Sequence, residues 1–128
     1  MSESWDMVYE EFLAECEYYG LDSRGITRTD YSYANGCGEE KGLHTSPFIW
    51  FVKVLVACQL HDIRWQKAER HTDLLLANIQ FSEDLRTVCR YESQNSFMRW
   101  ARYARIDKWV WLVENFGTED YSIKRGFR

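Results

Sequence analysis

The sequence has few of the residues that interrupt regular structure, with one proline and seven glycines among its 128 residues. Proline ends helices and glycine favours turns, so long regular segments are expected. The four cysteines, at positions 16, 37, 58 and 89, include no C-x-x-C pair, which argues against a zinc ribbon or zinc finger. We expect buried, reduced thiols, as is usual in a reducing compartment.

The sequence also lacks the segments that direct a chain into or across a membrane. Lys53, Gln59 and the pair His61-Asp62 interrupt its most apolar run, which is therefore not expected to span a bilayer. The first residues are acidic and amphipathic, unlike a secretory signal peptide, so a cytoplasmic location is expected. The net charge of −4 gives no sign of a general nucleic-acid binder, and direct binding to nucleic acid is not expected.

Charge is distributed unevenly along the chain. Residues 1–30 contain eight acidic and two basic residues, whereas residues 31–128 contain 12 acidic and 14 basic residues. The acidic face of the predicted helix over 4–19 is either solvated or a surface that mimics phosphate for a basic partner; it comprises Glu10, Glu11, Glu15 and Glu17. Farther along, basic residues recur every three positions and form a ridge. This ridge is either solvated or a contact surface for anionic lipid, nucleic acid or an acidic protein, and it comprises Arg99, Arg102, Arg105 and Lys108.

Apolar residues are abundant, at 45% hydrophobic and 16% aromatic, which is enough for the core of a single domain over 1–128. They recur at helical rather than alternating spacing, which predicts a small all-α fold. A buried central helix is expected over 47–65, with Ser46 as its N-cap and Pro47 at its first position. The full prediction is a helix over 4–19, a loop region over 20–46, a helical hairpin over 47–89 with its antiparallel second helix within 67–89, a helix over 96–116 and a tail over 117–128.

The central helix carries the pattern C-x-x-H-D-x-x-W, formed by Cys58, His61, Asp62 and Trp65. Cys58, His61 and Trp65 are spaced to share one helix face. Asp62 points about 100° away from His61 around the helix axis, so the two side chains should serve different partners. A histidine can accept a proton near neutral pH, and a neighbouring carboxylate can hold a metal ion. The alternative is a helix-end pair that makes only structural hydrogen bonds.

Upstream of this helix lies the glycine-rich segment N-G-C-G, residues 35–38. Alternating glycines let backbone carbonyls or amides converge on one point, as an ion-binding loop requires. A plain tight turn explains the same glycines. The G-K-[ST] ending of a phosphate-binding P-loop is absent.

Taken together, the N-G-C-G loop and the C-x-x-H-D-x-x-W helix resemble the core of the phospholipase A2 superfamily. Members encoded by phages, which carry an N-G-C-G loop and a C-x-x-H-D-x-x-Y helix, look most similar. The similarity extends to the run ending in Asp73 and covers about a third of the chain, residues 35–79. It implies a phospholipase A2-like fold, an ester or lipid substrate, and expression in the cytoplasm of a phage host.

The resemblance also implies roles for individual residues. His61 would be the general base that activates water, Asp73 would orient His61, and calcium would be held by Asp62 with the backbone carbonyls of Gly36 and Gly38. Cys37 and Cys58 correspond to a disulfide pair in secreted members, and we expect their side chains to lie close together. The sequence departs from the family pattern at Glu40, which replaces a loop glycine, and at Trp65, which replaces a tyrosine. The connection between Trp65 and Asp73 is also shorter than usual.

Two other functions remain open. The segment Leu60-His61-Asp62-Ile63 resembles the local motif of HD-type metal phosphohydrolases, in which an upstream histidine and a downstream aspartate complete the site; His44 and Asp107 are the candidates. The other alternative is a non-catalytic phage protein that binds and inhibits a host complex, of the anti-defence or anti-CRISPR type. A small acidic chain with many aromatic residues is compatible with that role.

Overall fold

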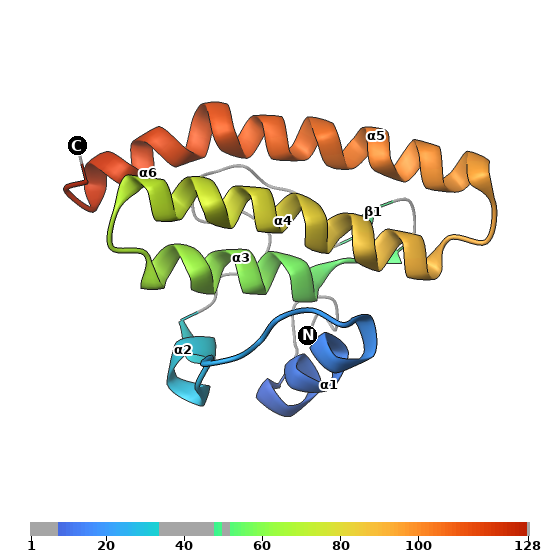
Figure 1. Cartoon of the computed structure of the whole chain (residues 1–128), viewed down its shortest axis with the longest axis horizontal. Helices are drawn as coiled ribbons and strands as arrows, with labels where there is room; N and C mark the ends of the chain where they lie inside the picture. Colours follow the sequence, from blue (N-terminus) through green and yellow to red (C-terminus); the bar gives the residue numbers. More distant parts are fainter. Residues whose placement is uncertain (1–7, 34–47, 50–51, 128) are drawn as a thin grey trace, which may run out of the picture.

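The computed structural model describes residues 8–33, 48–49 and 52–127, and the fold is mostly helical, as expected. Three long helices lie side by side (Figure 1). They are α3 (Leu55–Lys67), α4 (His71–Glu92) and α5 (Ser96–Leu112), and turns of three residues join them, so that neighbours run antiparallel. Helices α1 (Tyr9–Tyr19) and α2 (Arg28–Ser32) pack on the side of this layer opposite α5 (Figure 1). No helix among the described residues is long and apolar enough to cross a lipid bilayer.

The first part of the predicted central helix forms a small β-hairpin instead. Strand β1 (Phe48–Ile49) pairs antiparallel with β2 (Val52–Lys53), and the helix begins only at Leu55. The run from Phe48 to Val54 is rich in aromatic and β-branched residues, which suit a pleated strand better than a helix. The prediction of a helix from residue 47 is therefore wrong for this segment, and the proposed cap at Ser46 and Pro47 lies outside the described residues.

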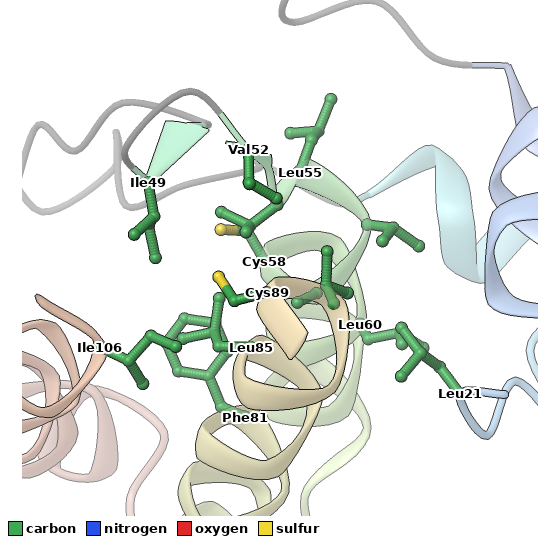
Figure 2. Packing of buried hydrophobic residues seen from close by; sticks show 14 of the residues in the cluster. Leu21, Ile49, Val52, Leu55, Cys58, Leu60, Phe81, Leu85, Cys89 and Ile106 are labelled. Carbon is green, nitrogen blue, oxygen red and sulfur yellow. The ribbon is translucent and has the colours of Figure 1, made fainter. Parts of the chain in front are cut away.

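The core forms where the hairpin, α1, α3, α4 and α5 meet (Figure 2). Leu55, Leu60, Leu85 and Ile106 are each at most 1% exposed. Nearly every residue from Val54 to Ile63 is buried, so α3 is the buried central helix that its apolar sequence predicts. Burial on this scale is the main stabilising contribution to a domain of this size.

Helix α1 has a glycine stop, as the sequence predicts. Gly20 has φ of 75°, and its backbone N–H donates to the carbonyls of Cys16 and Glu17. A left-handed residue at this place favours glycine because a Cβ atom would be strained there. The predicted loop region contains the short helix α2, whose cap is reciprocal: Thr27 Oγ1 accepts from the Asp30 N–H, and the Asp30 carboxylate accepts from the Thr27 N–H.

Much of the predicted tail over 117–128 is helical, from Thr118 to Lys124. After α5 the chain continues through the π-helical turn η2 (Val113–Gly117) into α6 (Thr118–Lys124). Arg125, directly after α6, donates to the carbonyl oxygens of Trp65 at 3.2 Å and Ala68 at 2.8 Å, at the end of α3. The Trp65 carbonyl also accepts from the backbone N–H of Ala68, the C-cap residue, so the arginine adds to the cap of α3 and fixes α6 against it.

The basic ridge on α5 is not a single face. Arg102 is buried and donates to Ser93 Oγ at 2.7 Å, whereas Arg105 and Lys108 are exposed. A step of three residues turns the side chain by about 60° around a helix, so residues spaced by three spread around it. The ridge therefore passes from the buried side of α5 to its solvent side.

Candidate functional site

His61 lies on α3 facing α4, in an aromatic and almost fully buried environment. Its side chain is 8% exposed. The ring of Phe81 stacks on the imidazole at 4.3 Å, and the ring of Trp65 lies 4.7 Å away, one turn along α3. The shared helix face of His61 and Trp65, expected from their spacing, is confirmed by this contact. The packing leaves the imidazole little freedom to rotate.

The polar partner of His61 is Asn78, which lies on α4 and is fully buried. His61 Nε2 lies 2.7 Å from Asn78 Oδ1. The same oxygen accepts a second hydrogen bond from Trp65 Nε1 at 3.2 Å, and Asn78 Nδ2 donates to Thr118 Oγ1 at 2.9 Å. One side-chain amide thus joins α3, α4 and the start of α6, and every polar atom of the amide is hydrogen-bonded.

This arrangement determines which nitrogen of His61 carries the proton. An indole N–H can only donate, so the amide oxygen of Asn78 must be the atom that faces Trp65 and His61. His61 Nε2 must then be the protonated nitrogen, because it also meets that oxygen. Nδ1 keeps its lone pair, and no side chain in the described part of the molecule is hydrogen-bonded to it. The network therefore presents Nδ1 as the proton acceptor of this site.

The surroundings keep His61 neutral at physiological pH. Burial is the main cause that lowers its pKa to about 4, and the positive charge of Arg64 acts in the same direction. The hydrogen bond to Asn78 opposes this effect. Asn78 is itself neutral, so it compensates an imidazolium charge less well than a carboxylate would. His61 is consequently a weak base in a fixed orientation.

Asp73 occupies a different place from the one its proposed role requires. Its Oδ2 accepts hydrogen bonds from the backbone N–H groups of Glu69 at 3.0 Å and Arg70 at 3.1 Å. These bonds, the one from Glu69 foremost, lower the pKa of Asp73. The carboxylate caps the first turn of α4, and the residue that meets His61 Nε2 is Asn78, five positions farther along the helix.

Of the proposed calcium ligands, the structure describes only Asp62, which is half-buried on α3. Gly36 and Gly38 lie outside the described residues, as do Cys37, Glu40 and His44. Within residues 8–33, 48–49 and 52–127, no group of three or more His, Cys, Asp or Glu side chains is placed to hold a metal ion. Asp107, a candidate for the HD-type site, forms an ion pair with Arg86 between α5 and α4.

The cysteines differ in their chemical state. Cys58 is disulfide-bonded, so the expectation of a reduced thiol is wrong at this position. Cys37, which we expect beside Cys58, lies outside the described residues. Cys16 and Cys89 are free and buried, as predicted, and burial raises the pKa of Cys16 to about 12 and that of Cys89 to about 11. Neither free thiol is therefore a nucleophile at neutral pH.

Asn78 and Thr118 are the site residues that the sequence did not identify. Asn78 falls among the apolar positions of α4, between Leu74 and Phe81, where an amide needs a specific partner. That position within a buried stripe is the signal that marks it. Thr118 carries no such signal, because its place depends on the π-helical turn before it.

Comparisons with known proteins give no match to a family model, to a curated protein or to a solved structure. The functional assignment therefore rests on the residues of this chain and on their geometry.

Proposed function

We propose that this protein is a phospholipase A2-like ester hydrolase in which His61 is the general base. The observation that supports this most is the shared acceptor between two antiparallel helices: His61 Nε2 and Trp65 Nε1 both meet Asn78 Oδ1. A general base must be held in one tautomer and one orientation, and this network does both. The indole N–H of Trp65 takes the position at which the family pattern has a tyrosine hydroxyl.

The proposed reaction is the attack of water on an ester carbonyl. His61 Nδ1 takes a proton from the water as the water oxygen bonds to the carbonyl carbon. The resulting imidazolium then gives that proton to the leaving alkoxide as the carbon–oxygen bond breaks, and His61 returns to its neutral form. Asn78 accepts the Nε2–H bond throughout and is a positioning residue. Because it carries no charge, it stabilises the imidazolium only modestly, so we expect a slow enzyme.

The fit of calcium to this site is incomplete in the described part of the chain. Calcium takes about six to eight oxygen ligands, and the described residues contribute one of the proposed ligands, the carboxylate of Asp62. A bound ion would polarise the ester carbonyl and stabilise the oxyanion. No step of the reaction above is assigned to it.

Hydrolysis of a short-chain phosphatidylcholine, followed by titration of the released acid, tests the proposal. We expect activity in the parent and a loss of about 10²–10⁴-fold in His61→Gln, which removes the base but retains a polar side chain. Lys53→Gln is the control, since it is a partly exposed residue of the hairpin and should leave the rate unchanged. A parent with no detectable hydrolysis, or a His61→Gln variant as active as the parent, would contradict the proposal.

A second candidate function is the non-catalytic inhibitor of a host complex, and one observation favours it. His61 is 8% exposed and stacks on aromatic rings, which also describes a histidine that only stabilises the core. In that case His61→Gln lowers the stability of the protein and leaves its biological effect intact at temperatures where it remains folded. An assay of phage growth on a defended host, run with the folded variant, separates the two functions.

A further inference from the structure

Helix α5 exposes large aromatic side chains on the side that faces away from the core. Phe97 is 70% exposed, Trp100 67% and Trp111 54%, and Phe116 in the following π-helical turn is 60% exposed. They form two pairs: the rings of Phe97 and Trp100 lie 6.1 Å apart, and those of Trp111 and Phe116 lie 5.7 Å apart. Exposed aromatic residues in such number are costly in water and usually mark a contact surface.

These residues belong to one face of the helix. With about 100° of rotation per residue, Phe97, Trp100 and Trp111 fall within about 60° of one another, and the buried Ile106 lies about 120–180° away from them. The two tryptophans are separated by about 16 Å along the axis. Helix α5 is the outermost of the three long helices (Figure 1). These exposed residues form a row along the outermost long helix, which we name the α5 aromatic face: Phe97, Trp100, Lys108, Trp111 and Phe116.

Charge indicates what this face contacts. Of the four basic residues of α5, Arg105 and Lys108 are exposed, whereas Arg102 is buried; the one acidic residue of this helix, Asp107, is paired with Arg86. Lys108 lies between the two aromatic pairs, and Arg105 is exposed beside it. Helix α1, on the opposite side of the molecule, contains four glutamates and no basic residue (Figure 1). The molecule is therefore polarised, and an anionic surface attracts α5 and repels α1.

We propose that the α5 aromatic face binds the surface of a membrane that contains anionic lipid. Indole rings partition to the interface of a bilayer, and lysine and arginine side chains reach its negatively charged headgroups. A helix lying in the plane of the interface presents a long, narrow apolar row of this kind. Hot spots of protein interfaces instead cluster near the centre of the contact, whereas the two aromatic pairs of this face lie apart along the helix axis.

This binding is independent of catalysis, because no residue of the α5 aromatic face belongs to the His61 site. The protein can therefore bind vesicles whether or not it hydrolyses esters. Failure of one proposal leaves the other unaffected, and each has its own measurement.

Sedimentation of the full chain with lipid vesicles tests the proposal. Vesicles of phosphatidylcholine with phosphatidylglycerol are compared with vesicles of phosphatidylcholine alone. We expect binding to the mixed vesicles, weakening in high salt, and a loss of at least about tenfold in the double variant Trp100→Ser/Trp111→Ser. Charge reversal in Lys108→Glu should weaken binding by at least about fivefold. Tyr33→Ser is the matched control, since Tyr33 is 62% exposed and is the C-cap residue of α2, a helix that packs on α3.

Three results would overturn the proposal. The parent fails to sediment with the mixed vesicles, or the double tryptophan variant binds as well as the parent, or Tyr33→Ser weakens binding as much as the tryptophan changes. Size-exclusion chromatography of the same proteins adds a check on the occupant. Self-association that depends on Trp100 and Trp111, without vesicle binding, would assign the face to a second copy of the chain instead.

Discussion

Asn78 is the residue on which the buried network depends, and its replacement by leucine is the sharpest test of that network. Leucine has a similar volume, so the variant keeps the packing between α3 and α4 but removes the hydrogen bonds to His61, Trp65 and Thr118. His61 Nε2 and Trp65 Nε1 lose their partner, whereas Thr118 Oγ1 keeps its hydrogen bond to the Val113 carbonyl. Each such loss costs about 1–3 kcal/mol, and we expect a total of about 3–5 kcal/mol because local relaxation recovers part of it.

The measurement is urea unfolding followed by far-UV circular dichroism, with the slope of the transition checked for a change in the unfolded state. Gln94→Leu is the control: it introduces the same side chain at an exposed position in the turn before α5, where we expect a change within about 0.5 kcal/mol. A loss below about 1 kcal/mol for Asn78→Leu, with an unchanged slope, would refute the reasoning that this amide holds the three helices together.

Three further predictions concern buried or bridging groups. The pKa of His61 in the folded protein is about 4, below its ordinary value of 6.5, so the unfolded chain binds the proton first as the pH falls. We therefore expect the free energy of unfolding to be unaffected by this group above about pH 6.5 and to fall by up to about 3 kcal/mol toward pH 4. Urea titrations at several pH values will show a smaller fall in His61→Gln. Arg64→Met removes the ion-pair partner of the Asp84 carboxylate, which is 3% exposed and lies 2.8 Å from the arginine. We expect the free energy of unfolding in urea to fall by about 3–5 kcal/mol, and a fall of less than about 1 kcal/mol would contradict this. Arg125→Gln removes the side-chain cap of α3 and should accelerate amide hydrogen exchange across α6 but not in α1. Equal exchange rates in α6 of the parent and the variant would show that Arg125 does not hold α6 in place.

The helices that could be predicted from sequence are those with a clear apolar stripe. Helix α4 has Leu74, Phe81 and Leu85 at helical spacing, and α5 has Ile106, Trp109 and Val110 on its buried side. The predicted end of the last helix at residue 116 is wrong, because the chain stays helical through Gly117 into α6. The β-hairpin could not be separated from α3, because a short continuous apolar run fits a buried strand and a buried helix equally well. In the run from Phe48 to Val54, only the β-branched and aromatic residues favour a strand over a helix.

Helix α6 was missed for a different reason, since polar contacts hold much of it. Ser122 Oγ lies 2.8 Å from His71 Nδ1, Thr118 accepts from Asn78, and Arg125 caps α3. Contacts of this kind leave no periodic apolar pattern in the sequence. They depend on where α3 and α4 end, which is a property of the whole fold.

Half of the candidate site could likewise be predicted. His61 and Trp65 are four residues apart on one helix, so their proximity follows from helix geometry alone. The partner from α4 depends on the register between two helices, which the three-residue turn after Lys67 sets. The sequence therefore indicated a partner on α4 but pointed to Asp73, whereas the register brings Asn78 to His61.

The hydrogen-bond network around Asn78 fixes His61 as a neutral base with its lone pair on Nδ1. Long-range nitrogen–proton correlation spectra of the folded protein, with histidine labelled by ¹⁵N, report the protonation of each ring nitrogen directly. We expect a protonated Nε2 and an unprotonated Nδ1 for His61 at neutral pH, and a loss of this single tautomer in Asn78→Leu. A parent protein with the proton of His61 on Nδ1, or with a rapidly exchanging mixture of tautomers, would contradict it.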